Sequence, residues 1–507
     1  MKRFISIMAI ILCLCTVLTA CGKPKSASGD VYDPPKNLMT LDQYHAELDK
    51  LLNATNFSNA DTGAIDKLGD RLAEMIKYNT DDITDVKGTT YYVAKNGDDK
   101  NDGKTPETAW ATLDKVNSAP LNPGDAVLFN RGDGWRGYLF AKNGITYGAY
   151  GKGLKPVISY SMDVKNGGKW EETDTENVWK FSERITAEDT GVLLFNNAED
   201  YADLRELDDL KDNNQFAFSG QRAQRGKKDN YLYLYCDKGN PAEVYDSMEV
   251  TLAGKSVVYM LNNTHDVTLN NLKLCGGNDT FFASNLTNIK ISYCQNFWSG
   301  GNRDTYGTRL GGGSGAWFSC DGIYIENCHI YQQFDAGISP QYSGSNEAVS
   351  VFKDFVAKNC LFEYCEYTFE YFNNQTNSLE ERYENFYFGY NFCRLGGYGF
   401  GDKPSNSRYI KSWGTGSACV DCVIENNVFD RAATTSIEIV GKKQTAEGNV
   451  FDINYMPKLK NNIYIHQKNK RFATIQDTTY KFNEETYNTL INMGVDEGAR
   501  YFYAENK

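Results

Sequence analysis

The chain has 507 residues and a formal net charge of −13, from 66 Asp and Glu against 53 Lys and Arg. This acidic balance, without a basic stripe, argues against nucleic acid as a partner because phosphate would be repelled, although a local basic cleft could still accept an anionic polysaccharide. The length allows one large solenoid with appendages or two to three ordinary domains. Aromatic residues make up 13% of the chain, which suits stacking on sugar rings and equally suits a core of stacked strands.

The first segment, residues 1–20, has the pattern of a lipoprotein signal peptide. A positive start is followed by an almost wholly apolar run over 4–17, and Leu18-Thr19-Ala20-Cys21 is similar to the bacterial lipobox. We therefore expect cleavage before Cys21, lipidation of Cys21, and a protein held at the extracytoplasmic face of a bacterial membrane. The apolar run is too short to span a bilayer comfortably, so the lipid is the expected membrane contact. Residues 21–37 are rich in Ser, Pro and Lys and form a polar tether.

Residues 38–85 carry helical spacing of apolar residues in two runs, separated by a polar break at 56–63. The helix pair could be a spacer between membrane and solenoid or a lid on the first coil. Residues 86–169 change to short β-rich segments, which we assign to the first coils and an N-terminal cap. Residues 170–255 alternate strand-like pieces with polar turns but do not fit the later repeat, so they are either a β-rich insertion or irregular coils.

A repeat fills the segment 256–455 and predicts its main β-helix. Short apolar strands that end in a polar turn recur at intervals of 22 to 35 residues, which suits a parallel β-helix with loops bulging from one corner. The repeats are 269–274, 291–298, 325–332, 357–364, 389–395, 424–430 and 447–452, and the residues after the turn are Leu272, Cys294, Cys328, Cys360, Phe392, Asn427 and Asn449. Residues 456–507, with a predicted helix over 483–493, would cap the open end.

Two positions recur with the same residue type from repeat to repeat, and each residue type has a physical reason. Asparagine stands at the turn in five repeats, and it tolerates the left-handed conformation that such a bend needs; these residues are Asn271, Asn327, Asn359, Asn391 and Asn426. Cys294, Cys328 and Cys360 share the next column, where stacked coils would bury them as a ladder of small apolar side chains. Cys419 and Cys422 have the spacing of a zinc knuckle but no second pair of ligands nearby, which favours a structural or disulfide role.

The segment 91–161 carries a resemblance to a known family. It contains YYVAKNGDDKNDGKTPETAWATLDKVNSAPLNPGDAVLFNRGDGWRG, followed by GITYGAYGKGLKPVIS. It resembles the amino-terminal portion of bacterial right-handed parallel β-helix proteins of the pectate-lyase-like superfamily. The resemblance implies an all-β solenoid, a polysaccharide or oligosaccharide partner, and polysaccharide lyase or glycoside hydrolase activity. The acidic turn at Asp98, Asp99, Asn101 and Asp102 could bind Ca²⁺, but Lys100 interrupts the acidic alternation and favours a solvated turn.

In that superfamily the site usually lies on the sheet that precedes the longest loops, here the second strand of each coil: 337–339, 369–371, 401–403 and 437–439. Counting ten residues from Cys360 and Phe392 reaches Glu370 and Asp402, and eleven from Asn427 reaches Glu438. We therefore predict Glu370 and Asp402 side by side on the floor of a groove walled by 373–384 and 404–418. Carboxylates stacked that closely must be protonated, ion-paired or bound to a cation.

The expected roles follow from the two reaction classes. A lyase needs a positive group beside the substrate uronate and a base for the α-proton, whereas an inverting hydrolase needs two carboxyls across a water. The candidate catalytic residues are Glu370, Asp402, Lys403, Asp335 and Glu438, and the candidate substrate-binding residues are Tyr371, Tyr398, Arg408, Lys411 and Trp413. Lys403, Arg408 and Lys411 tilt the prediction toward a lyase.

Two observations keep other functions open. The strand at 315–318 lacks the acidic residue, and position 340 lacks the histidine, that related chains often carry, which leaves room for a noncatalytic glycan-binding or surface-structural lipoprotein. In that case Trp298, Trp317 and the aromatic candidates would be stacking faces, and Glu370 and Asp402 solvent-facing bystanders. With four histidines, none beside a candidate nucleophile, a Ser-His-Asp hydrolase is poorly supported. We expect a monomer.

Overall fold

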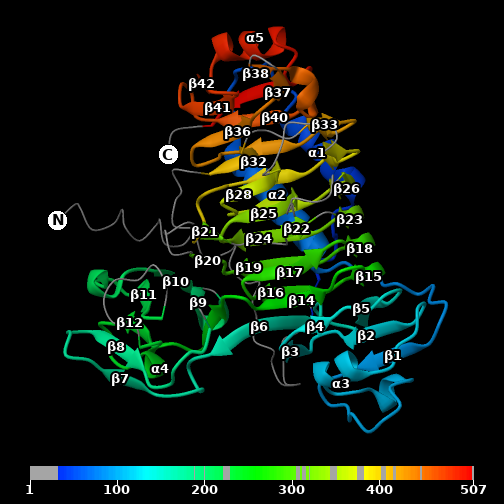
Figure 1. Ribbon diagram of the computed structural model, residues 1–507, viewed down its shortest axis with the longest axis vertical. Coiled ribbons are helices and arrows are strands. Elements are labelled where there is room, and N and C mark those ends of the chain that lie inside the picture. Colours follow the sequence, from blue (N-terminus) through cyan, green and yellow to red (C-terminus); the bar gives the residue numbers. More distant parts are fainter. Residues whose placement is uncertain are drawn as a thin grey trace.

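The computed structural model describes residues 32, 34–187, 189–198, 200–220, 229–303, 309–310, 316–318, 320–342, 351–373, 382–400, 407–414, 418–445 and 448–504. Its main body is a right-handed parallel β-helix, as predicted, in which each full coil adds one strand to each of three long sheets (Figure 1). The interior is filled by apolar and aromatic side chains that point inward from all three sheets.

We call the sheets 1, 2 and 3 in the order in which the chain visits them in each coil. Sheet 1 contains β1 (Thr90–Val93), β2 (Ala126–Asn130), β5 (Thr146–Tyr150), β15 (His265–Asn270), β18 (Thr287–Ser292), β23 (Asp321–Glu326), β26 (Phe352–Lys358), β30 (Tyr387–Gly389), β34 (Val423–Glu425) and β39 (Lys458–Lys460), with β29 (Arg382–Glu384) and β33 (Ala418–Val420) beside it. Sheet 2 contains β3 (Gly134–Arg136), β6 (Val157–Asp163), β16 (Lys273–Gly276), β19 (Gln295–Ser299), β24 (His329–Gln333), β27 (Leu361–Glu363), β31 (Phe392–Arg394), β35 (Val428–Asp430), β40 (Ile463–His466) and β43 (Arg500–Tyr503). Sheet 3 contains β4 (Leu139–Phe140), β14 (Ser256–Met260), β17 (Asp279–Ser284), β22 (Ala316–Phe318), β25 (Ala336–Tyr342), β28 (Tyr367–Asn373), β32 (Arg408–Gly414), β36 (Thr435–Ile439), β41 (Arg471–Ile475) and β42 (Thr478–Lys481).

Additional elements surround the solenoid. Between β6 and β14 the chain leaves it to form a lateral, largely antiparallel unit with its own apolar core (Figure 1). Its elements are β7 (Trp170–Glu172), β8 (Val178–Phe181), β9 (Thr190–Phe195), β10 (Asp200–Leu204), β11 (Gln215–Phe218), β12 (Leu232–Tyr235), α4 (Pro241–Val244) and β13 (Met248–Leu252). Two short hairpins, β20 (Asn302–Arg303) with β21 (Arg309–Leu310) and β37 (Lys442–Thr445) with β38 (Gly448–Phe451), complete the strands.

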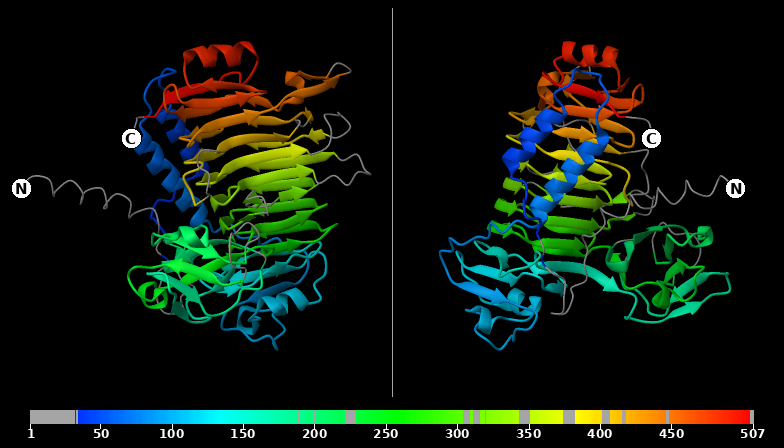
Figure 2. Two further views of the ribbon diagram at one scale, coloured as in Figure 1. Left: turned by 60° about the vertical axis from the view of Figure 1, so that its left-hand side comes forward. Right: turned by 180° about the vertical axis from the view of Figure 1, so that it is seen from behind.

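The helices occupy the ends and one side. α3 (Leu113–Ser118) lies near the first coils, and α5 (Glu484–Asn492), begun by the Asn483 side chain as N-cap, lies over the opposite end as predicted (Figure 1). α1 (Leu41–Leu51) and α2 (Thr62–Lys77) run along the outer face of sheet 2, where they pack on Leu361, Phe392, Val428 and Ile463 (Figure 2). The helix pair therefore covers the side of the later coils and is no lid on the first one.

The turn between sheets 1 and 2 explains the repeat. Asn271, Asn327, Asn359 and Asn426 all have φ between 54° and 56°, which confirms the left-handed bend predicted for them. The prediction was wrong for Asn391, because Tyr390 takes the bend in that coil with φ of 56°. Phe392 accordingly pairs with Leu361 rather than standing beside Cys360.

The next column forms a continuous internal ladder. Cys294, Cys328 and Cys360 stack in register and are fully buried, as predicted. The column then changes to Asn391, Asn427 and Asn462, and the side-chain amide of each of the first two donates to the carboxamide oxygen of the next, at 3.1 and 3.0 Å. The seventh repeat was misplaced, since Asn449 belongs to the β37–β38 hairpin and Asn462 follows Asn427 in the ladder.

Candidate functional site

The candidate site is a column of polar residues on the outer face of sheet 3. Glu370 pairs with Lys411 in the neighbouring strand, and Lys411 pairs with Glu438 in the strand after that. Side chains alternate along a strand, so Phe369 and Tyr371 point into the core with no exposed surface while Glu370 points outward. Ser339 lies one rung before Glu370 and completes the column.

The register corrects the predicted neighbour of Glu370. In this coil the strand paired with β28 is β32, which starts at Arg408 and sets Lys411 opposite Glu370 in place of the predicted Asp402. The chain makes a longer connection after β31 than in the preceding coils, so counting ten residues from Phe392 did not reach the strand. Asp402 and Lys403 lie outside the described residues. Within the described strands, the second carboxylate of the column is Glu438, two rungs from Glu370.

The column is held together by direct contacts. Lys411 Nζ lies 2.7 Å from Glu370 Oε1, and Ser339 Oγ donates to Glu370 Oε2 at 3.2 Å. Lys411 Nζ also lies 3.7 Å from the centre of the Tyr367 ring, a cation–π contact. Arg408 forms an ion pair with Glu438 on the same face.

The charged side chains differ in their access to water. The side chains of Glu370 and Lys411 are 8% and 7% exposed, whereas that of Glu438 is 26% exposed. Burying charges is costly unless they are paired and hydrogen-bonded, and here each carboxylate has a cationic partner. The two carboxylates therefore share one face but differ in burial, an environment that can give the members of a pair different roles.

The structure places the other predicted site residues in different surroundings. Tyr371 is fully buried in the core, so its predicted role in binding substrate is wrong, and Trp298 and Trp317 are likewise 2% and 0% exposed. Tyr398 is 52% exposed and offers its ring to solvent. Asp335 lies in the turn between β24 and β25, where its carbonyl accepts from the amide of Tyr367. The side chain of Trp413 is outside the described part of the chain.

A second ionic cluster, which was not predicted from the sequence, lies on the outer face of sheet 2. Arg394 contacts Glu363 at 2.6 Å and Asp70 of α2 at 2.6 Å, and Glu363 also contacts His329 at 2.6 Å. Burial would raise the pKa of Glu363, but Arg394 and His329 outweigh it and lower the pKa to about 2. Arg394 and Asp70 are 324 residues apart in the sequence, so no sequence pattern predicted this cluster.

That cluster is structural. Gly69 of α2 faces Arg394 so closely that a Cβ on it would lie 2.5 Å from the guanidinium. Arg394 Nη1 also donates to the carbonyl of Asp66 at 2.7 Å, and Asp66 pairs with Arg431. The cluster is covered by α2, so it fastens the helix pair to the solenoid.

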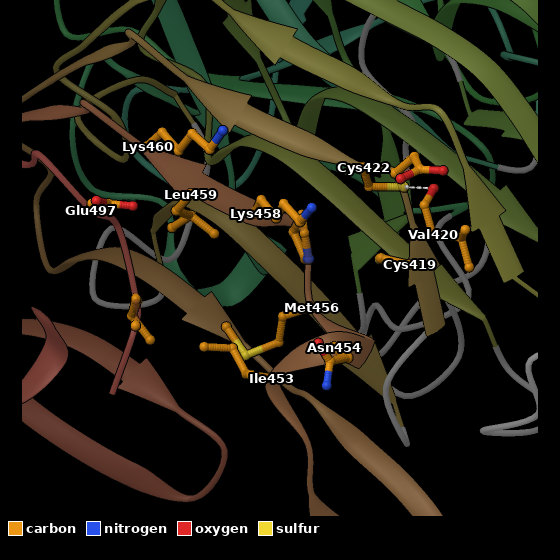
Figure 3. A pocket seen from close by; sticks show the side chains of 14 residues that line it. Cys419, Val420, Cys422, Ile453, Asn454, Met456, Lys458, Leu459, Lys460 and Glu497 are labelled. Atoms are coloured by element: carbon orange, nitrogen blue, oxygen red, sulfur yellow. Dashed lines mark hydrogen bonds between the residues drawn. The ribbon is translucent and has the colours of Figure 1, made fainter. Parts of the chain in front are cut away.

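A cavity of about 540 Å³ lies near the C-terminal end and is lined by Cys419, Cys422, Met456 and Lys458 among others (Figure 3). Both cysteines are buried and neither forms a disulfide, which fits the structural option of the prediction. Asp421 and Glu497 are the carboxylate residues among those that line it. Among the described residues, no group of three or more His, Cys, Asp and Glu side chains is placed to hold a metal ion.

The acidic turn proposed for Ca²⁺ is used by the protein itself. Asp99 accepts from the amides of Ala111 and Thr112 and from the Thr112 hydroxyl, at 2.6 to 3.1 Å. Asp102 accepts from the Lys104 amide and the Thr108 hydroxyl. These hydrogen bonds shape the turn before α3.

Of the helices in the described ranges, none is both long and apolar enough to cross a bilayer.

Comparison of the sequence with known proteins finds a local similarity. A lacto-N-biosidase of Bifidobacterium longum subsp. longum is 38% identical over 123 residues, which are 22% of this chain and 8% of that protein. The match therefore spans a small part of that relative. No family model matches the chain.

The similar solved structures are distant. They include a lacto-N-biosidase of Eubacterium ramulus, at 12% identity over 94% of this chain and 81% of that one with a TM-score of 0.34. A rhamnogalacturonan lyase shows 12% identity over 78% and 90% with a TM-score of 0.39. XylC in complex with xylose shows 14% identity over 82% and 84% with a TM-score of 0.39. The named activities belong to those proteins.

Proposed function

We propose that the protein is a glycoside hydrolase that cleaves a polysaccharide or oligosaccharide on the outer face of sheet 3. The observation that carries the proposal is the placement of Glu370 and Glu438 in one outward column, two rungs apart, with Lys411 between them. Two rungs at about 4.8 Å each separate the backbones by roughly 10 Å. Carboxyls that act as acid and base in inverting glycosidases stand about 6.5 to 9.5 Å apart, which side chains leaning toward each other would reach.

The neighbouring cations fit this assignment. Lys411 and Arg408 each hold one carboxylate, so neither carboxylate is left buried without a partner before substrate arrives. Lys411 is itself engaged by Glu370 and Tyr367, which makes it a poor free base. One carboxyl would protonate the leaving oxygen and the other would activate a water molecule. This is why we prefer hydrolysis to the elimination that the sequence favoured.

β-Elimination on an acidic glycan is the second candidate. Lys411 and Arg408 lie on the same face, where two cations could neutralise a substrate uronate. Lys403 was predicted to assist and lies outside the described residues. A noncatalytic glycan-binding role for the same face is the remaining alternative.

We further propose that the protein acts as a monomer tethered by a lipid on Cys21 to the extracytoplasmic face of a bacterial membrane. The lipobox-like sequence and the polar tether over 21–37 support this placement. The lipid is the proposed membrane contact, and the acidic net charge argues against nucleic acid as a partner. Hydrolysis by two carboxyls requires no metal, so we expect activity to survive a chelator; a dependence on Ca²⁺ would instead favour the acidic-glycan candidate.

The experiment is an assay on a panel of neutral and uronate-containing polysaccharides. New reducing ends without the ultraviolet absorbance of an unsaturated uronate indicate hydrolysis, the same ends with that absorbance indicate elimination, and retention without either indicates binding alone. Glu370→Gln and Glu438→Gln should each lower turnover at least about 100-fold. Glu326→Gln is the matched control, because Glu326 forms the same kind of ion pair with Lys358 of the next rung, at 3.1 Å, on sheet 1. Full activity in either site variant would refute the assignment of Glu370 and Glu438 as the catalytic pair.

A further inference from the structure

An exposed aromatic surface lies at the N-terminal end of sheet 3. Phe282 is 48% exposed and Tyr138 is 40% exposed, although both are large and apolar. The Tyr259 ring lies between them, 5.4 Å from the Tyr138 ring and 6.0 Å from the Phe282 ring, centre to centre. Tyr160 extends the run, 5.9 Å from Tyr138. We call these four residues the aromatic platform.

The aromatic platform continues the column of the candidate site. Tyr259 pairs with Phe282, Phe282 with Ala316, Ala316 with Ser339, and Ser339 stands one rung before Glu370. Since residues matched in register share a face, Phe282 and Glu370 both belong to the outward column of sheet 3. Three rungs separate them, roughly 14 Å at about 4.8 Å per rung, a length that about three linked pyranose rings cover.

The chemistry of the aromatic platform points to a sugar chain. Contiguous exposed apolar surface on a soluble protein is costly and marks a binding site more often than not. Flat rings with a polar edge suit the apolar face of a pyranose, because the ring face contacts C–H groups while the sugar hydroxyls stay in water. The rings follow one another along the solenoid axis, so they suit a chain that lies along that axis better than a compact ligand.

We propose that the aromatic platform is a set of binding subsites for an extended glycan, which lies along sheet 3 from Tyr138 and Phe282 to the ionic column at Glu370. The protein would thus select long chains over short ones, because only a chain of about five or more rings reaches from the column to Tyr259. This inference deepens the proposed function and rests on it for the identity of the cleavage point. The binding itself does not depend on cleavage.

Affinity electrophoresis of the full chain tests the proposal, in separate native gels that contain xylan, galactan, polygalacturonate or alginate. Wild type should be retarded in at least one gel. The double variant Tyr138→Ala/Phe282→Ala should bind that polymer about tenfold more weakly, since each lost stacking contact is worth part of that factor. Both residues are exposed, so the variant should fold, which the circular dichroism spectrum and the melting temperature would verify.

The matched control is Tyr390→Asn. Tyr390 is 42% exposed and lies at the turn between sheets 1 and 2, and asparagine occupies the same left-handed position in neighbouring coils. This variant should be retarded like wild type. Equal retardation of the double variant and wild type, equal loss in the double variant and the control, or no retardation of wild type in any of the four gels would overturn the proposal.

A cleavage assay on the retained polymer separates this inference from the proposed function. A wild type that is retarded but cleaves nothing refutes the hydrolase and leaves the subsites standing. If the protein does cleave the retained polymer, the double variant should lose about tenfold in kcat/KM on long chains and keep the wild-type value on a disaccharide, which is too short to reach Phe282. A loss of the same size on both substrates would mean that the aromatic residues only stabilise the site as a whole. That result would contradict the proposal that they form subsites.

Discussion

The asparagine ladder ends on a carboxyl, and that carboxyl offers a sharp test of the structure. Asp496 is 3% exposed and accepts the Asn462 amide at 3.1 Å and the Tyr464 hydroxyl at 2.6 Å. Burial raises the pKa of Asp496 from the ordinary 3.8 to about 6, because these donors only partly replace lost water. Asp496→Asn should extend the ladder with another carboxamide and remove the ionisation.

The magnitude follows from proton linkage. A carboxyl whose pKa is higher in the folded than in the unfolded chain binds protons more readily when folded. Its stabilising contribution is therefore full below about pH 4 and is lost as the pH rises through about 6. A difference of about 2 pKa units corresponds to roughly 3 kcal/mol. With an unfolding entropy of about 2.1 cal/mol/K per residue over a chain of this length, that is a Tm difference of roughly 3 °C.

The assay is thermal unfolding of wild type and Asp496→Asn across about pH 4 to pH 8. We expect the Tm of the variant to rise by about 3 °C relative to the Tm of wild type as the pH rises through 6, because only wild type then carries the buried charge. Asp421→Asn is the control, since Asp421 is an exposed turn residue whose left-handed conformation, φ of 53°, suits asparagine. A Tm difference between wild type and Asp496→Asn that stays constant over the whole range would refute the reasoning.

Two further predictions concern the helix pair and the tether. Arg394→Ala should lower the free energy of unfolding by about 3 to 5 kcal/mol, because it leaves the buried Glu363 carboxylate without its strongest partner, and hydrogen exchange should show faster opening of α2. Unchanged exchange in α2 would show that the apolar contacts of the helix pair suffice without the ion pairs. Cys21→Ser should move the protein from the membrane to the soluble extracytoplasmic fraction on cell fractionation, and a protein that stays with the membrane would contradict the lipid anchor.

Features that depend on neighbouring residues were predictable from the sequence. Asparagine was correctly placed at the left-handed bend in Asn271, Asn327, Asn359 and Asn426, because the steric demand of that bend acts on one residue at a time. The cysteine ladder followed from the same local count across short coils. The outward orientation of Glu370 followed from strand alternation, and the same alternation turns Tyr371 into the core, against its predicted role in binding substrate.

Features that depend on loop length were decided by the tertiary structure. A turn can lengthen without disturbing the stacked strands, so sequence distance does not measure the distance between rungs. The connection before β32 therefore moved Lys411, not Asp402, beside Glu370, and the β37–β38 hairpin displaced the last repeat from Asn449 to Asn462. The sequence alone thus determined the solenoid and the local conformation of its turns. Which charged side chains meet on its outer face was decided by the register of strands, because hydrogen bonding between whole coils sets that register.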